Sequence, residues 1–417
     1  MIRFTRQTLD NGLRVIVHRD VSTPMAVINM LYDVGSRDEH ENRTGLAHLL
    51  EHLMFGGSAN IPSYDRKVRK AGGENNAYTS NDITDYYIKL PAVNLETGLW
   101  LESDRMTDLN LTQKGLDIQR NVVIEEFRQR YLNQPYGDIW MILRPLAYKK
   151  HPYRWPVIGK DISHIENITL DEVRSFYNEH YCPSNAILSI AGNVDEDKCF
   201  FLARKWFESS GRRKKNIRIL PSEPIRKKAS EMSVTRDVPY HEIIMVFGMC
   251  SRDDGCYYTA DLVSDLLAGG RSSRLYRNLV MERKIFSSIN AYITGDRDPG
   301  LFVVRGRLTG GVAVEEGHEH IKQELNALIS NPPAKKELDK VKNKFEATKQ
   351  YTHSDILHKA VDLAYYELLG DADLLNKEID IYRKITTGQI EECAGKILDL
   401  STSTTLFYKS NQKSAAH

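Results

Sequence analysis

The sequence predicts an α+β protein of two similar halves, each built on a largely antiparallel sheet. Strand-like segments open each half and helices follow at irregular intervals, which favours antiparallel pairing over a strict βαβ series. The order strand, helix, Gly-Gly, strand occurs in both halves, which indicates a duplication. A basic, proline-containing stretch separates the halves. We therefore expect domains at 1–210 and 231–417, joined by a linker at 211–230.

The first half alternates short strands with amphipathic helices. Runs rich in β-branched and aromatic residues predict strands at 13–18, 25–33, 76–90 and 186–191. Apolar residues at helical spacing, ended by glycine or a polar loop, predict helices at 44–55, 64–70, 93–106, 112–132 and 171–181.

The pattern begins again after the linker. The same criteria predict strands at 243–249, 289–294 and 301–306. They predict helices at 259–268, 272–283, 315–330, 334–346, 355–369 and 387–398.

Composition and charge place the chain among folded globular proteins. Of its 417 residues, 41% are hydrophobic and 27% are charged, and 57 Lys and Arg against 56 Asp and Glu leave a net charge of +1. This balance gives no electrostatic reason to expect a nucleic-acid partner. No apolar run is long enough for a membrane span. The N-terminus lacks a signal-like apolar segment, so we expect the cytoplasm, or the periplasm if a signal peptide has been removed.

The five cysteines are scattered along the chain. They are Cys182, Cys199, Cys250, Cys256 and Cys393. Cys250 and Cys256 have no matching second pair, so the spacing predicts neither a zinc ribbon nor a disulfide framework. We expect reduced, mostly structural thiols.

The segment around His48-Leu-Leu-Glu51-His52 carries the chemistry. His48 and His52 are four residues apart, so a helix places them on one face, close enough to hold one metal ion. Glu51 flanks the pair and is placed to act as a general base. The alternative is that all three are ordinary polar residues of an amphipathic helix. The surrounding leucines argue against it, because unpaired ionisable groups are costly in apolar surroundings.

Two imidazoles do not complete a zinc site, so a third ligand must come from elsewhere. Glu126 is the best candidate, because its spacing from Val122 and Val123 continues an apolar, inward-facing stripe. The alternative, in which both Glu125 and Glu126 are solvated, remains open on spacing alone.

At this point the sequence resembles the inverzincin M16 metallopeptidases, the family of pitrilysin, insulin-degrading enzyme and mitochondrial processing peptidase. The similarity is closest to its short bacterial-type members and covers essentially the whole chain. The motifs that carry it are His48-x-x-Glu51-His52, Gly73-Glu-Asn-Asn76-Ala77-Tyr78-Thr79-Ser80, Arg120-Asn-Val-Val-Ile-Glu-Glu126, His151-Pro152-Tyr153 and Tyr181-Cys-Pro183-Ser-Asn185. The resemblance implies that His48, His52 and Glu126 bind one Zn²⁺ per chain. It also implies that Glu51 deprotonates the zinc-bound water.

The resemblance further implies two similar α/β-sandwich domains, each a mostly antiparallel sheet with helices on one face. The domains would face each other across a chamber, with peptides bound there in extended form. Asn76, Ala77, Tyr78 and Thr79 would then pair their main chain with the peptide substrate. The alternative is that this segment is simply a buried strand of the sheet.

Two positions depart from the family pattern. Many relatives have a glutamate seven residues before the third ligand, where this chain has Gln119; a neutral amide still forms hydrogen bonds but adds no charge. Active single-chain relatives also carry an Arg and, seven residues later, a Tyr that hold the substrate carbonyl. Val280 and Ser287 occupy those places here, and neither side chain replaces Arg and Tyr at an oxyanion.

The absence of the Arg/Tyr pair affects which partner subunit we expect. We expect a homologous M16 subunit to supply the Arg/Tyr pair, in a heterodimer. The second choice is a homodimer in which Arg283, Tyr276 or Tyr292 substitutes.

The sequence therefore predicts a zinc endopeptidase acting on peptides or short unfolded segments. The alternatives are a non-catalytic structural subunit of the same fold and a zinc-storing or zinc-sensing protein. The donor types would also suit cobalt or manganese.

Overall fold

The computed structural model describes residues 1–211 and 218–411, which divide into two compact units. Unit 1 consists of the described residues of Met1–Arg130, Trp155–Pro221 and Gln350–Lys377; unit 2 consists of those of Tyr131–Arg154, Ser222–Lys349 and the segment from Glu378 onward. The units therefore differ from the expected contiguous halves at 1–210 and 231–417. Two segments, here called the crossing segments, account for this difference: Tyr131–Arg154 belongs to unit 2 and Gln350–Lys377 belongs to unit 1. The apolar side chains of each pack on the sheet of the other half of the chain. Residues 212–217 of the expected linker lie outside the described residues.

Unit 1 contains a six-stranded sheet in the order β1-β2-β6-β3-β5-β4. Its strands are β1 (Thr5–Thr8), β2 (Arg14–Arg19), β3 (Met25–Tyr32), β4 (Glu74–Thr79), β5 (Thr84–Pro91) and β6 (Ala186–Gly192). Only β2 and β6 pair in parallel; the other neighbours are antiparallel. The central strands β3 and β6 are almost wholly apolar and buried, whereas the polar β4 forms one edge.

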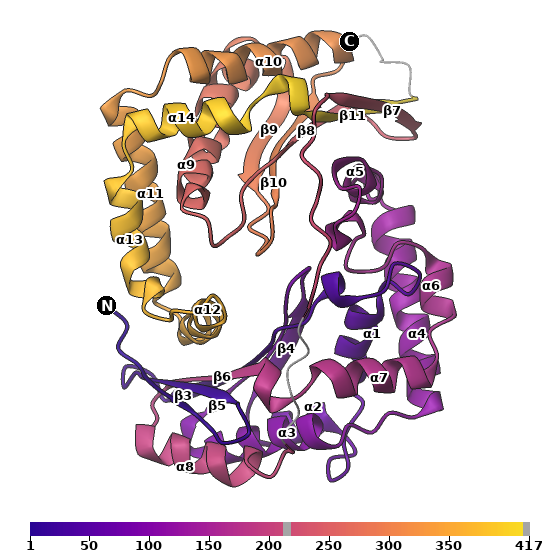
Figure 1. Cartoon of the computed structure of the whole chain (residues 1–417), viewed down its shortest axis with the longest axis vertical. Helices are drawn as coiled ribbons and strands as arrows, with labels where there is room; N and C mark the ends of the chain where they lie inside the picture. Colours follow the sequence, from indigo (N-terminus) through magenta and orange to yellow (C-terminus); the bar gives the residue numbers. More distant parts are fainter. Residues whose placement is uncertain (212–217, 412–417) are drawn as a thin grey trace. The chain divides into compact units, whose positions relative to one another are not determined.

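Helices pack on both faces of this sheet (Figure 1). The helices of unit 1 are α1 (Leu46–Leu53), α2 (Tyr64–Lys70), α3 (Leu95–Thr107), α4 (Gln113–Phe127), α6 (Ile162–Glu166), α7 (Leu170–His180), α8 (Glu196–Phe207) and α12 (Ile356–Leu368). In Figure 1, α3 and α8 lie on one face and α12 lies on the other. Leu363 and Ala364 of α12 are buried against Ile16, Leu31 and Ile187 of the sheet.

Unit 2 repeats the topology with five strands in the order β7-β11-β8-β10-β9. They are β7 (Ser230–Arg236), β8 (Glu242–Gly248), β9 (Phe286–Ile293), β10 (Leu301–Leu308) and β11 (Thr404–Ser410). The pairing is parallel between β7 and β11 and antiparallel elsewhere, which is the pattern of β2-β6-β3-β5-β4 in unit 1. The predicted fold class, two similar units with mostly antiparallel sheets, is confirmed. The expectation of helices on one face only is wrong, because α12 comes from the second half of the chain and packs on the face of the first sheet opposite α3 and α8.

The helices of unit 2 also lie on both faces of its sheet. They are α5 (Ile139–Ala147), α9 (Cys256–Ala268), a π-helical segment (Tyr276–Glu282), α10 (Val314–Ser330), α11 (Lys335–Thr352), α13 (Leu374–Lys384) and α14 (Thr387–Ile397). Both α11 and α13 extend a few residues across the division between the units. The main core contains side chains of α9, α10 and α14 with those of β8, β9 and β10. Ile139 and Leu143 of the crossing helix α5 cover the other face.

Two predictions about local structure are wrong. The strand expected at 76–90 is a hairpin of β4 and β5, because the Ser80 hydroxyl accepts hydrogen bonds from the N–H groups of Asp82 and Ile83 and closes a turn. Cys250 and Cys256 form a disulfide instead of remaining reduced, because the loop before α9 brings their Cα atoms to 6.6 Å. Cys182, Cys199 and Cys393 are buried free thiols.

Among the described residues, no helix combines the length and the apolar composition that crossing a bilayer requires.

Candidate metal centre

Helix α1 is held at its start by a buried carboxylate. Glu39 accepts hydrogen bonds from the N–H groups of Gly45, at 3.0 Å, and Ala47, at 2.8 Å. These groups are among the donors that a helix N-terminus leaves without an intrahelical partner. Gly45 itself has φ of 90°, and a Cβ there would lie 2.7 Å from the carbonyl oxygen of Ile158, so glycine is required. Glu39 thus positions the helix that carries the predicted metal ligands.

The structure brings His48, His52 and Glu126 together. The histidines lie one turn apart on α1, and Glu126 lies near the end of α4, which packs against α1. Glu126 Oε2 is 3.8 Å from Nε2 of His48 and 3.6 Å from Nε2 of His52. One donor atom from each residue lies within 4.8 Å of the other two.

This donor set fits Zn²⁺. Tetrahedral zinc with bonds of about 2.0–2.1 Å places its ligand atoms roughly 3.3 Å apart, close to the observed spacing. Burial lowers the pKa of His48 to about 3, with the charge of His52 adding to the effect. Burial also lowers the pKa of His52. Both imidazoles are therefore neutral at physiological pH, which is the form that binds metal.

Glu51 is directed toward the edge strand β4. The Thr79 hydroxyl donates a hydrogen bond to Glu51 Oε2 at 2.5 Å. Burial raises the pKa of Glu51 to about 6; the Thr79 hydrogen bond opposes the shift, and the charge of Glu126 adds to it. A carboxyl group with a pKa just below neutrality suits general base catalysis.

Two further side chains contact the ligands. Gln119 is hydrogen-bonded to His52, as the amide at this position was expected to allow. Nη1 of Arg130 lies 2.8 Å from the other oxygen of Glu126, Oε1. Such contacts orient ligands and tune metal affinity.

The predicted basis for Glu126 is only partly correct. Val123, Ile124 and Phe127 are buried, but Val122 is 46% exposed, so the inward stripe does not include it. The side chain of Glu125 is 59% exposed and pairs with Arg128. The alternative in which both glutamates are solvated therefore holds for Glu125 but not for Glu126.

The proposed substrate strand, Asn76 to Thr79, is most of β4 at the open edge of the first sheet. Tyr78 is 41% exposed, so the strand is not buried. Ala77 donates its N–H to the side-chain oxygen of Asn76 at 2.9 Å.

Neither Val280 nor Ser287 resembles a residue that stabilises an oxyanion. Val280 is packed against the core of unit 2, and the Ser287 hydroxyl donates to the carbonyl of Arg307 at 3.2 Å. Three residues are possible substitutes for the Arg/Tyr pair. Arg283 Nη1 lies 2.7 Å from His320 Nδ1. Tyr292 lies beside Arg305 on the second sheet, and Tyr276 begins the π-helical segment.

Sequence reasoning missed Glu39, Arg130 and the contact between Thr79 and Glu51. The four-residue spacing of Glu126 and Arg130 is a signal that predicts their ion pair. Glu39 and the Thr79 contact depend on tertiary packing, for which the sequence has no comparable signal.

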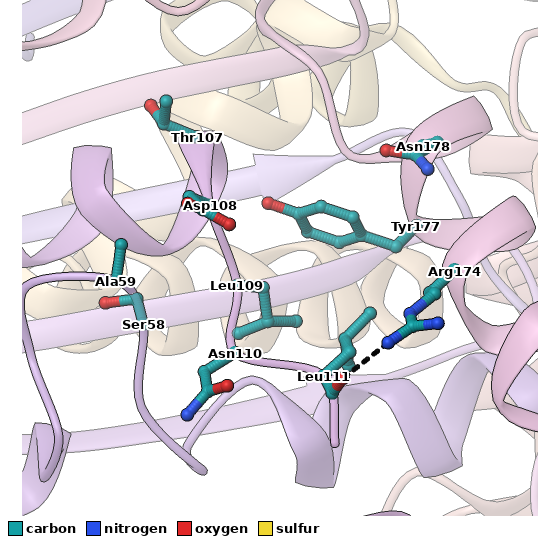
Figure 2. Close-up of a pocket in the computed structure, with 10 residues that line it drawn as sticks. All are labelled: Ser58, Ala59, Thr107, Asp108, Leu109, Asn110, Leu111, Arg174, Tyr177 and Asn178. Atoms are coloured by element: carbon teal, nitrogen blue, oxygen red, sulfur yellow. Dashed lines mark hydrogen bonds between the residues drawn. The ribbon is translucent and has the colours of Figure 1, made fainter. Parts of the chain in front are cut away.

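A separate cavity of about 500 Å³ in unit 1 is lined by none of the predicted site residues. Figure 2 shows Arg174 and Tyr177 of α7 facing the segment that follows α3. Arg174 donates to the carbonyl of Leu111 at 3.2 Å, and Tyr177 donates to the carbonyls of Arg105 and Met106, at 2.8 Å each. These contacts anchor α7.

Comparison with known proteins agrees with this geometry. Residues 14–157 match the family model described as Insulinase (Peptidase family M16), and residues 167–345 match the one described as Peptidase M16 inactive domain. Together the two models span most of the chain. The chain belongs to peptidase family M16, a family of zinc metalloproteases.

Individual relatives show the same similarity. The chain is 31% identical over 416 residues to Zinc protease PqqE of Helicobacter pylori (strain ATCC 700392 / 26695), covering 96% of this chain and 92% of that protein. It is 26% identical over 310 residues to a probable mitochondrial-processing peptidase subunit beta of Arabidopsis thaliana, covering 71% and 58% of the two chains.

Solved structures share the fold. The crystal structure of a protease from Helicobacter pylori superposes with a TM-score of 0.91 at 30% identity, covering 98% of this chain and 100% of that one. A peptidase M16 inactive domain from Pseudomonas fluorescens gives a TM-score of 0.88 at 18% identity, covering 99% and 98%.

Proposed function

We propose that this chain is a zinc-dependent endopeptidase that hydrolyses peptides or short unfolded segments. The main observation behind this proposal is that His48, His52 and Glu126 converge. Glu51 lies beside them and accepts a hydrogen bond from Thr79 of the edge strand β4. A structural subunit or a zinc store would have no use for a half-buried, hydrogen-bonded base at this place.

The roles of the residues follow from their chemistry. His48, His52 and Glu126 would hold one Zn²⁺, which supplies Lewis acidity for the attacking water and the scissile carbonyl. Glu51 takes a proton from the attacking water and returns it to the leaving amine. Thr79 holds the Glu51 carboxylate in place, and Gln119 orients His52.

A peptide is proposed to add as a strand to the open edge of β4, along Asn76, Ala77, Tyr78 and Thr79. Main-chain pairing gives affinity with little demand on the peptide's sequence. The hydrogen bond between Thr79 and Glu51 supports this placement, because it puts the base next to the strand.

We also propose that a homologous M16 subunit supplies the missing Arg/Tyr pair, with a homodimer as the second choice. The character of Val280 and Ser287 supports this, since neither side chain can replace Arg or Tyr at a developing oxyanion. The engagement of Arg283 with His320 weakens its case as a substitute.

The compartment stays a prediction, either cytoplasm or periplasm. The Cys250–Cys256 disulfide supports the periplasmic alternative, because disulfides persist in oxidising compartments.

The test is cleavage of a quenched fluorescent peptide library by the purified, zinc-supplied chain, with Glu51→Gln as the matched variant. We expect cleavage to fall by at least about a thousandfold in Glu51→Gln while zinc content is unchanged. If the wild-type chain binds zinc but does not cleave, adding a homologous M16 subunit should restore activity. Zinc-independent cleavage, or full activity in Glu51→Gln, would overturn the proposal.

A further inference from the structure

A pair of arginines lines a cavity in unit 2, remote in sequence from the proposed zinc ligands and from Glu51. Arg305 and Arg307 are two residues apart on β10, so their side chains share one face of the second sheet. On that face Arg305 lies opposite Asn290 of β9, while Arg307 lies opposite Ser288 of β9 and Glu242 of β8. These residues line a cavity of about 370 Å³ beside β9, the edge strand.

The two arginines share one buried carboxylate. Arg305 contacts Glu242 Oε2 through Nε, at 2.7 Å, and Nη2, at 2.6 Å. Arg307 contacts the other oxygen, Oε1, through Nε, at 2.8 Å, and Nη2, at 2.7 Å. The Glu242 side chain is only 2% exposed, whereas those of Arg305 and Arg307 are 30% and 38% exposed.

After binding Glu242, the two arginines keep one net positive charge and N–H donors that Glu242 does not occupy. One arginine is sufficient to neutralise Glu242, so the second leaves a net positive charge in a half-buried site. Each guanidinium has five N–H donors and keeps its Nη1 amino group after binding Glu242. Among the described residues that line the cavity, Glu242 is the sole acid.

The remaining lining fits an anion. The Arg307 guanidinium lies 4.6 Å from the centroid of the Tyr136 ring, which limits its movement. Burial raises the pKa of Tyr292, although the charges of Arg305 and Arg144 oppose the shift, so its hydroxyl stays protonated and can donate. Asn290 and Ser288 add exposed polar groups at the rim.

We propose that Arg305 and Arg307 form a carboxylate-binding site for an acidic group of a bound peptide. A guanidinium presents paired donors that match planar carboxylates. Arg305, Arg307 and Glu242 leave one surplus positive charge among the lining residues, which matches a monoanion better than a phosphate dianion. The group is the C-terminal carboxylate or an Asp or Glu side chain. The inference rests on the proposed function, because peptides are the substrates of that function.

The test measures binding without cleavage, so that it succeeds or fails separately from the peptidase proposal. The full chain carrying Glu51→Gln, freed of metal by chelation, is titrated into a fluorescein-labelled Gly/Ser/Ala peptide with one glutamate and a free C-terminus. Fluorescence anisotropy gives the affinity. A second peptide carries a C-terminal amide, a third carries glutamine for glutamate, and a fourth carries both changes.

Four further substitutions are compared in that background. Arg305→Gln removes a donor, and Asn290→Asp places a competing carboxylate opposite Arg305 at an exposed position, where folding is not at risk. Asn290→Ser is its neutral control, and Arg271→Gln removes a positive charge at an exposed position outside the cavity.

We expect Arg305→Gln and Asn290→Asp to weaken binding by about tenfold or more, and the two controls to bind like the parent. If the peptide with the C-terminal amide loses affinity, the bound group is the C-terminal carboxylate. If the peptide with glutamine loses affinity, the bound group is the glutamate side chain. The proposal is overturned if the doubly neutral peptide binds as tightly as the acidic one, if Asn290→Asp has no effect, or if the parent chain binds no peptide.

Discussion

The hydroxyl of Thr79, in the edge strand β4, donates a hydrogen bond to Glu51 on α1, with 2.5 Å between Oγ1 and Oε2. The bond connects the proposed base to the strand on which a substrate is proposed to lie. It fixes the orientation of the Glu51 carboxylate beside the strand.

Replacing Thr79 with valine keeps the shape of the side chain and removes the hydroxyl. We expect kcat/KM for peptide cleavage to fall about tenfold, because a hydrogen bond to a charged group contributes about 1.5–3 kcal/mol. Zinc content should not change. Thr79→Ser, which keeps the hydroxyl, should retain most of the activity, and equal losses in both variants would show that the hydroxyl has no role.

Gln119 offers a test of ligand tuning. It is hydrogen-bonded to His52, and a carboxylate there would make the imidazole more basic. We expect Gln119→Glu to raise zinc affinity about tenfold and Gln119→Ala to lower it by a similar factor, measured by competition with a chelator at fixed pH. If the two variants shift affinity in the same direction, the proposed charge effect is wrong.

Glu39 offers a test of how α1 is positioned. Glu39→Ala leaves the N–H groups of Gly45 and Ala47 buried without a partner, which should cost about 3 kcal/mol of unfolding free energy. Zinc affinity should fall as well, because the start of the ligand-bearing helix loosens. Urea unfolding and chelator competition measure the two effects. Glu39→Gln keeps one carbonyl acceptor and should show about half of each loss.

The ion pair of Asp20 and Lys359 predicts how stability depends on pH. Lys359 Nζ on α12 lies 2.6 Å from Asp20 Oδ2, and the two side chains are 14% and 15% exposed. The lysine hydrogen bond, with those of Ser22, holds the pKa of Asp20 well below its usual value of 3.8. The ionised form is therefore favoured in the folded state, so the pair's contribution is present above the unfolded pKa and is lost as the pH falls below it.

Lys359→Met should therefore destabilise the chain by about 1 kcal/mol at neutral pH, and the difference from wild type should shrink as the pH falls below 3.8. Urea unfolding across the acid range gives the comparison. A difference that does not vary with pH would show that lost packing, not charge, causes the effect.

The parts of the site that follow from helix geometry were predictable. The spacing of His48, Glu51 and His52 sets their directions on α1 wherever the helix lies. Glu126 lies on a different helix, and its role came from the resemblance; the stripe expected to support it fails at Val122. The contacts of Thr79 and Glu39 depend on how β4 and the segment before α1 pack, which has no local sequence pattern.

The fold shows the same division. Most helices and strands were predicted because their periodicity is local. The crossing segments were not, because an apolar helix such as α5 does not indicate which sheet it will cover. The juxtaposition of Glu242 with Arg305 and Arg307 likewise depends on strand register, which is set by long-range pairing.

We infer that His48, His52 and Glu126 together hold one zinc ion, and the zinc stoichiometry of the purified chain is the decisive measurement. Glu126→Gln and Glu125→Gln form a matched pair, since the two residues are neighbours on α4 and the Glu125 side chain is 59% exposed. We expect one zinc per chain in wild type and in Glu125→Gln, and at least about tenfold weaker binding in Glu126→Gln and His52→Ala. Equal zinc binding in Glu126→Gln and wild type would contradict it.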